Sequence, residues 1–351
     1  MPLLARTILS PVAIEISAGA VEGLAPLLAE GRISARGDVA IAVGPGQGEA
    51  LADTIRRTLP KAQVFRVDGA SMDSAQALIG GLRSTFFDAV VGIGGGKTLD
   101  VAKYAASMVG LPFVAVATNL SNDGLASPVA SLESHGRKGS FGVHIPIAVF
   151  VDLNLVRQSP ARHTRSGTGD VISNLNAIAD WQLAARERGE TLDGLAITFA
   201  RTAAEALLTR DAELDSDAFL TTLAEALFLS GMAMSVAGSS RPCSGGCHEI
   251  GHAIDALYPD AGLHGEVVAV GAMFASYLRE DPTLEAIDAC LRRNGVPRLP
   301  ADLGLTAEEF TAAVVEAPST RPDRYTILEH LNLERNEIRK RVDAFVEAFT
   351  D

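Results

Sequence analysis

Two histidines stand four residues apart in the run His248-Glu249-Ile250-Gly251-His252. This spacing puts both side chains on one face of a helix, so both can point into the same cleft. In the zinc-protease form of this motif both histidines bind the metal and the glutamate acts as general base. The chain departs from the longer protease form, which requires a glycine where Asp255 stands. We therefore favour a metal site of another kind.

A third histidine and a carboxylate can complete that site. His264 precedes an apolar helical segment, and Asp170 lies in Gly-Thr-Gly-Asp-Val-Ile-Ser-Asn, where we expect the first helix of the second half to open. Three protein ligands and one open position are the pattern of catalytic zinc sites. An aspartate at the start of a helix is more commonly only a cap. The role of Asp170 as a ligand therefore depends on the family resemblance described below.

A glycine run offers a second kind of chemistry. A strand expected over residues 88–93 leads into Gly-Gly-Gly-Lys-Thr at 94–98, and a helix is expected over 97–109. Glycines at a strand-to-helix turn let backbone N–H groups approach a phosphate, and the helix N-terminus adds positive partial charge. The P-loop and the dinucleotide fingerprint both fail, because Val91 and Lys97 stand where they require glycine. We favour pyrophosphate binding over a tight turn without a ligand.

The two halves of the chain differ in pattern. In the first half, β-branched runs expected to form strands alternate with helical segments, which predicts βαβ units and a covered parallel sheet. The expected strands are 39–43, 63–67, 88–93, 113–117 and 147–151. Beyond about residue 155, apolar residues recur at the helical period. We predict an α/β protein: a Rossmann-like dinucleotide-binding domain over 1–155 and an all-helical metal- and substrate-binding domain over 156–351. The ligand crevice is expected outside the carboxyl ends of the strands, between these domains.

Composition excludes several classes of protein. The chain has 43 acidic and 30 basic side chains and a net charge of −13, which argues against nucleic acid as a partner. No apolar run reaches the roughly 20 residues of a membrane span, and the N-terminus lacks the features of a signal peptide. Three cysteines cannot form a disulfide framework. A cytoplasmic location is the expectation.

Four segments together resemble the dehydroquinate synthase-like superfamily of metal-dependent polyol dehydrogenases, and within it the glycerol-1-phosphate dehydrogenase family. They are Thr118–Pro128, Gly169–Asn174 with Asp180 and Trp181 beyond, Gly245–Asp255 with Leu263–Glu266, and Arg321–Leu328. The likeness extends over nearly the whole chain and implies the dehydroquinate synthase-like fold. One departure is Cys247, which stands where the family usually has an acidic residue before the first metal histidine.

The resemblance implies a role for each candidate residue. Asp170, His248 and His264 would hold the metal, with His252 outside that set, touching substrate and relaying a proton. Asp123 would face the substrate, so the implied catalytic and substrate-binding residues are His252, Asp123 and Asp170. The implied cofactor-binding residues are Gly95, Gly96, Lys97, Thr98 and Leu99 around the pyrophosphate, together with Thr118, Ser121 and Ser127.

The implied reaction is the reduction of dihydroxyacetone phosphate to sn-glycerol-1-phosphate by NAD(P)H, a step of phospholipid biosynthesis, and its reverse. One divalent metal is implied, most favourably Zn²⁺, with Fe²⁺ or Ni²⁺ as alternatives. Gly44 follows the first strand where a carboxylate would repel a 2′-phosphate, so we expect NADP(H) to be accepted. Arg241, Arg321 and Arg324 are the candidates for the substrate phosphate. A homodimer or higher homo-oligomer is expected.

Three rival functions stay open. A dehydroquinate synthase-like cyclase would share the metal site, but such cyclases carry a lysine-bearing segment where this chain has Ser121-Asn122-Asp123-Gly124. A dehydrogenase of an unphosphorylated polyol would share the whole site apart from the phosphate contacts. A non-catalytic binding protein on the same scaffold would be favoured by loss of a metal ligand, and all three candidate ligands are present.

Overall fold

The computed structural model describes residues 9–30, 33–34, 36–134 and 137–350. The chain divides into two compact units, one made of Met1–Leu120 and Gly124–Pro160, the other of Ser121–Asp123 and Ala161–Asp351. The sequence placed the boundary at residue 155, and it did not indicate that three residues near 122 belong with the helical half.

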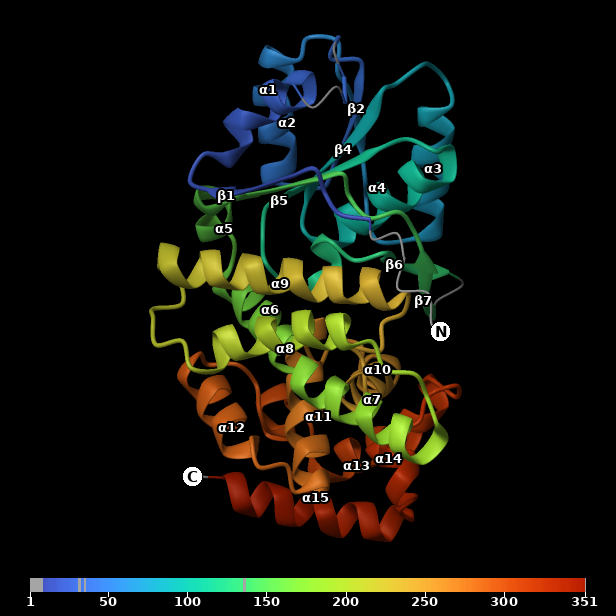
Figure 1. Cartoon of the computed structure of the whole chain (residues 1–351), viewed down its shortest axis with the longest axis vertical. Coiled ribbons are helices and arrows are strands. Elements are labelled where there is room, and N and C mark those ends of the chain that lie inside the picture. Colours follow the sequence, from blue (N-terminus) through green and yellow to red (C-terminus); the bar gives the residue numbers. More distant parts are fainter. Residues whose placement is uncertain (1–8, 31–32, 35, 135–136, 351) are drawn as a thin grey trace. The chain divides into compact units, whose positions relative to one another are not determined.

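A six-stranded sheet forms the centre of the first unit, with the strand order β1-β8-β5-β4-β2-β3 and every pairing parallel (Figure 1). The strands are β1 (Ala13–Ser17), β2 (Val39–Val43), β3 (Gln63–Arg66), β4 (Ala89–Gly94), β5 (Phe113–Ala117) and β8 (Ala148–Asp152). The four inner strands are buried along their whole length, as continuous apolar runs in a covered parallel sheet must be. The predicted α/β class is confirmed.

Helices cover both faces of this sheet (Figure 1). α1 (Leu24–Glu30) and α2 (Gln47–Thr58) contribute Leu24, Leu28 and Ile55 to a core shared with the odd-numbered side chains of β2 and β4. On the opposite face, α4 (Gly96–Val109) brings the Cβ of Ala102 to within 3.0 Å of where a Cβ on Gly92 would lie. α3 (Met72–Leu82) packs beside α4.

Three smaller groups complete the first unit. β6 (Val129–Ser134) and β7 (Arg137–Gly142) form an antiparallel pair that the sequence did not predict, and β6 packs on α4. The edge strand β1 was also missed, because its residues are only partly buried and lack a long apolar run. The 3-10 turn η1 (Ala20–Gly23) and helix α5 (Leu153–Gln158) lie next to β8.

The second unit is helical, as predicted. Its helices are α6 (Ala161–Ile172), α7 (Asn174–Arg188), α8 (Gly194–Leu208), α9 (Asp217–Ala237), α10 (Gly246–Leu257), α11 (His264–Arg279), α12 (Leu284–Arg293), α13 (Ala307–Thr320), α14 (Ile327–Leu331) and α15 (Arg335–Phe349). The segment 171–187, expected as part of one helix opening at Asp170, is divided at Ser173, whose hydroxyl donates to the Asp170 carbonyl at 2.7 Å. Asp170 therefore lies in the last turn of α6, and its expected place at a helix start was wrong.

Helix α9 is long and apolar enough, by length and composition alone, to cross a membrane. Its most apolar 18-residue stretch has a mean hydropathy of 1.5, and 61% of that stretch is buried inside the protein. It packs against α8 and α6. These contacts account for the apolar sequence of α9 as that of a core helix.

Candidate active site

Three candidate metal ligands from three helices lie together in the second unit. Asp170, His248 and His264 each offer one ligand atom, and these atoms all lie within 4.8 Å of one another. Oδ1 of Asp170 is 3.6 Å from Nε2 of His248 and 3.8 Å from Nε2 of His264. The structure thus brings together the three residues that the family resemblance selected as a metal-binding set.

Glycines let two of these helices approach at backbone distance. A Cβ on Gly265, one residue after His264, would lie 1.8 Å from the carbonyl oxygen of Ser166 on α6. A Cβ on Gly169, one residue before Asp170, would lie 2.3 Å from the carbonyl oxygen of Gly265. The Gly265 N–H also donates to the Ser166 hydroxyl at 3.1 Å. These contacts fix the separation of Asp170 and His264.

Asp180 holds the third helix. In the sequence it was named only as part of a family-like segment, and no role was predicted for it. Its carboxylate accepts hydrogen bonds from the backbone N–H of Gly246, where α10 begins, at 2.7 Å and of Ile327, where α14 begins, at 2.8 Å. Arg279, at the end of α11, donates to the same carboxylate. Burial raises the pKa of Asp180, and Arg279 and the two N–H groups oppose that rise. An acid within the largely apolar stretch 177–184 was the available signal.

The protonation states at the cluster suit a divalent cation. Burial acts to raise the pKa of Asp170, but the neighbouring imidazoles and the Asp123 N–H outweigh it, and the pKa lies below its ordinary value. Burial lowers the pKa of His248 to about 4, so its ring is neutral at pH 7. A carboxylate and a neutral imidazole are the forms that bind metals. Oδ2 of Asp170 accepts the Asp123 N–H at 2.9 Å, whereas the buried Oδ1 has no hydrogen-bond partner within the described residues. A divalent cation would satisfy that oxygen.

His252 lies beside the cluster and outside the set of three ligands. Its ring centroid is 6.3 Å from that of His248 and 6.1 Å from that of His264. The Arg321 guanidinium donates to its Nε2 at 3.2 Å. Because arginine can only donate, this bond leaves the ring proton of a neutral His252 on Nδ1. A substrate-contacting histidine with a fixed tautomer is consistent with the role expected for it.

Cys247 departs from the family pattern without adding a metal ligand. It is fully buried, and burial raises its pKa to about 12. Its Sγ lies 3.4 Å from Nδ1 of His248, on the ring nitrogen opposite the one that faces Asp170. The side chain is therefore a thiol that packs behind the histidine, and such outer contacts orient a ligand.

The glycine loop lies in the first unit, between β4 and α4. A Cβ on Gly95 would lie 2.4 Å from Nδ2 of Asn119, and one on Gly44 would lie 2.2 Å from Oγ1 of Thr98. Glycine at 44 thus has a packing cause that is independent of cofactor choice. Lys97 is exposed, while Thr98, Leu99 and Thr118 are buried. The N-terminus of α4 begins directly after Gly95, as a phosphate site on a helix dipole requires.

The remaining predicted residues lie near residue 124. The Ser121 carbonyl accepts the Ser166 hydroxyl at 2.9 Å, within the second unit. Ser127 is 2% exposed, and its hydroxyl donates to the Val129 carbonyl at 3.1 Å and lies 3.4 Å from Nζ of Lys103. The cofactor roles of Ser121 and Ser127 stay predictions.

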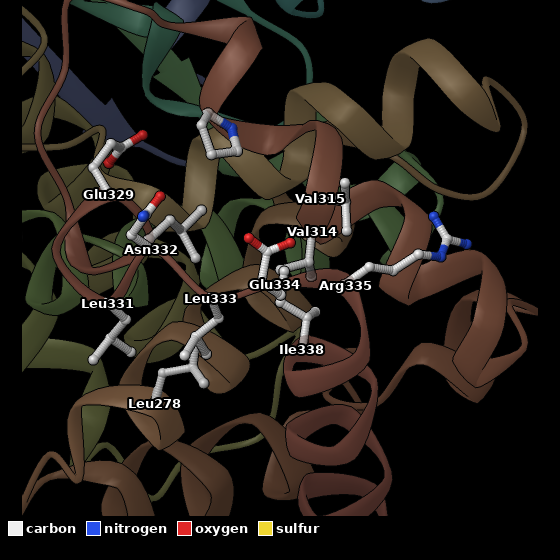
Figure 2. A pocket seen from close by; sticks show the side chains of 12 residues that line it. Leu278, Val314, Val315, Glu329, Leu331, Asn332, Leu333, Glu334, Arg335 and Ile338 are labelled. Carbon is white, nitrogen blue, oxygen red and sulfur yellow. The ribbon is translucent and has the colours of Figure 1, made fainter.

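Two cavities in the second unit contain none of the predicted site residues. Figure 2 shows the first, about 330 Å³ in volume, whose lining includes the apolar side chains of Val314, Leu331 and Ile338 from α13, α14 and α15. The second, about 610 Å³, is lined by Arg165 and by residues of 211–214 and 292–295. Neither is the site assembled by Asp170.

Similarity to known proteins decides the family. A glycerol-1-phosphate dehydrogenase of Sulfurisphaera tokodaii, whose name carries NAD(P)+, is 36% identical over 296 residues, covering 83% of this chain and 84% of the relative. The chain belongs to the glycerol-1-phosphate dehydrogenase family. A relative of the same name from Methanospirillum hungatei is 41% identical over 70% of the chain and 69% of its own length. As a member of this family, the protein is an oxidoreductase.

Two further comparisons agree with this family. The family model described as iron-containing alcohol dehydrogenase matches residues 15–160. A solved structure, titled a probable glycerol dehydrogenase from Sinorhizobium meliloti, has a TM-score of 0.79 at 24% identity and covers 98% of this chain and 99% of its own. At that identity the likeness shows the fold alone. The predicted fold, a Rossmann-like unit followed by a helical one, is confirmed.

Proposed function

We propose that this protein is a metal-dependent NAD(P)H oxidoreductase that interconverts dihydroxyacetone phosphate and sn-glycerol-1-phosphate. The observation that carries the proposal is the Asp170–His248–His264 cluster in a member of the glycerol-1-phosphate dehydrogenase family. A buried carboxylate oxygen without a hydrogen-bond partner, facing two imidazoles, supports a divalent cation there.

The ligand set suits several metals, with Zn²⁺ our first choice and Fe²⁺ or Ni²⁺ as alternatives. A divalent metal bound there would polarise the substrate ketone and stabilise the alkoxide. Asp170 would hold it through Oδ1, because Oδ2 is engaged by the Asp123 N–H. His248 and His264 would hold it through Nε2, the nitrogens that face that oxygen.

Other side chains of this protein bind substrate and handle the proton. We assign the proton relay to His252, because imidazole exchanges protons near neutral pH and its ring lies next to both metal histidines. Asp123, whose backbone is fixed on Asp170, is assigned to the substrate hydroxyl. Gly95, Gly96, Lys97, Thr98 and Leu99 are assigned to the pyrophosphate, and Thr118, Ser121 and Ser127 to the rest of the cofactor.

One assay tests this function. Purified protein is mixed with dihydroxyacetone phosphate and NADPH or NADH, absorbance is followed, and the assay is repeated after chelation and with His248→Ala. We expect oxidation of the nicotinamide that chelation abolishes and added Zn²⁺ restores, and an inactive His248→Ala. The matched control is His144→Ala, because His144 is an exposed histidine of the other unit. Activity that survives both chelation and His248→Ala refutes metal catalysis.

A further inference from the structure

Three arginines lie near one another, and one of them, Arg321, contacts His252. Arg241 donates to both oxygens of Glu190 and to the Tyr325 carbonyl. Arg324 donates to the Ser244 carbonyl and to the Ser240 hydroxyl. These contacts tie the turn after α13 to the segment that precedes α10.

The third arginine, Arg321, contacts His252. Arg321 follows the last residue of α13, and the Arg324 N–H donates to its carbonyl at 2.9 Å, which closes a tight turn. Its Nη2 lies 3.2 Å from Nε2 of His252. This guanidinium group contacts the histidine that we assign to the substrate.

Like charges lie close together here. Arg321 and Arg241 both act on the Arg324 guanidinium, and the carboxyl groups of Glu249 and Glu190 oppose their effect. Burial, acting together with the nearby Arg321 and Arg241, lowers the pKa of Arg324 to about 10. Buried positive charge of this kind is stabilised by an anion.

We propose that Arg321 is the residue that recognises the phosphate of the substrate and so makes the enzyme specific for phosphorylated three-carbon ketones and alcohols. Guanidinium donors match phosphate oxygens in pairs, and arginine keeps its charge at every working pH. Arg324 and Arg241 are positioning residues that hold the turn. This inference rests on the proposed function, since it assigns the phosphate end of the same substrate.

The test measures specificity. The Zn²⁺-loaded protein and its Arg321→Met and Arg321→Lys variants are assayed with dihydroxyacetone phosphate and with unphosphorylated dihydroxyacetone. We expect Arg321→Met to lower kcat/KM for the phosphorylated ketone by about 100-fold, since bonds to charged groups are strong, and to change it for dihydroxyacetone by less than about threefold. Arg321→Lys should retain part of the preference. The matched control is Arg186→Met, an arginine of the same unit whose side chain is 68% exposed.

Two results would overturn the inference. An equal loss on both ketones would mean that Arg321 acts through the tautomer of His252. An unchanged preference would mean that another group binds the phosphate. In either case the wild-type enzyme would still reduce dihydroxyacetone phosphate, and the proposed function would stand.

A binding measurement tests the inference in the case where the proposed function is wrong. If wild-type enzyme reduces neither ketone, the proposed function fails, and calorimetry with glycerol-1-phosphate and with inorganic phosphate decides the inference alone. Binding by wild type and Arg186→Met that Arg321→Met weakens at least tenfold supports it. Equal binding by all three, or none by any, overturns it.

Discussion

The two oxygens of Asp170 have separate tasks. Oδ2 is engaged by a backbone N–H, and Oδ1 faces the two imidazoles without a hydrogen bond. Asp170→Asn keeps the shape of the side chain but removes its negative charge. The NH2 group of the asparagine can then face the metal in place of an oxygen. We expect metal content to fall below one tenth of an equivalent and kcat to fall by at least about 100-fold. Metal analysis and steady-state kinetics measure both.

Asp123→Ala is the matched control for that change. Asp123 contacts Asp170 through its backbone N–H, which alanine retains. The variant should therefore keep a full equivalent of metal while losing turnover. If it loses metal as Asp170→Asn does, the separation of tasks described above is wrong.

The cysteines should be unreactive in the folded protein. All three are buried, and burial raises the pKa of each: Cys243 well above its ordinary value, Cys247 to about 12, and Cys290 in the same direction. A raised thiol pKa means that the thiolate, which is the nucleophile, forms only at higher pH. We expect Ellman's reagent to label none at pH 8 or 9 in the native state, and all three in guanidinium. Rapid native labelling at pH 8 would show that these thiols are accessible.

Residue types and spacing indicated the histidines of the candidate metal site, whereas Asp170 depended on the family resemblance and the supporting residues had no predicted role. Histidines at such a spacing are informative by themselves, because few structural roles require several of them together. Asp180 and Lys103 are different, since their partners come from segments that only folding brings near. Lys103 is fully buried and donates to the carbonyls of Gly124 at 2.8 Å and Ser127 at 3.2 Å. Its neighbours in the sequence, Val101, Ala102, Ala105 and Ala106, were the only sign of that burial.

At the scale of helices, the contact between α6 and α11 sets the geometry of the candidate metal site. Gly265→Ala would put a Cβ 1.8 Å from the Ser166 carbonyl, so the helices must separate. We expect the free energy of unfolding to fall by more than about 3 kcal/mol and metal affinity to fall with it. Gly194→Ala is the control, because its Cβ enters open space at the start of α8, and we expect a change within about 0.5 kcal/mol. Chemical denaturation and metal titration compare the two.

Lys103 ties helix α4 to the segment 124–131. Asp100 lies 3.4 Å from its Nζ and accepts the Ser131 N–H at 3.1 Å. Lys103→Met leaves the Asp100 carboxylate buried without this cation, and removing one partner of a buried pair costs about 3–5 kcal/mol. We expect that loss of stability by denaturation, together with a raised KM for the nicotinamide cofactor.

The double variant Lys103→Met/Asp100→Asn separates stability from positioning. Asparagine keeps an acceptor for the Ser131 N–H but removes the stranded charge, so most of the lost stability should return. The KM should stay raised, because the lysine bonds to Gly124 and Ser127 are still missing. Recovery of both quantities would show that Lys103 has only a structural role.

Elements with a long apolar pattern were predictable, and those defined by a few contacts were not. The inner strands β2, β4, β5 and β8 match their predicted ranges closely, because burial on both faces forces a continuous apolar run. The edge strand β1 is half exposed and gave no such run. The division between α6 and α7 depends on the Ser173 hydroxyl, a local bond that the helical period does not reveal.

At the scale of the whole molecule, the two candidate binding sites belong to different units. The candidate metal ligands all lie in the second unit, which also contains the short segment Ser121–Asp123. The glycine loop lies in the first unit. A ligand that binds only the folded state stabilises what it touches, by about 2.7 kcal/mol at a hundred times its dissociation constant. Adding Zn²⁺ to metal-free protein should therefore raise Tm and slow hydrogen exchange mainly in α6, α10 and α11.

Hydrogen exchange at the backbone amide of Asp123 best tests the assignment of the metal to the second unit. This residue is far in sequence from the three candidate metal ligands, yet its N–H donates to Asp170. Metal should slow its exchange together with that of residues 161–172, 246–257 and 264–279, and should leave β4 and the start of α4 unchanged. NADPH added without metal should give the opposite pattern, with protection around residues 94–99. Exchange mass spectrometry with short overlapping peptides measures both. Equal protection of 94–99 and 246–257 by metal alone would contradict the assignment of the cation to the second unit.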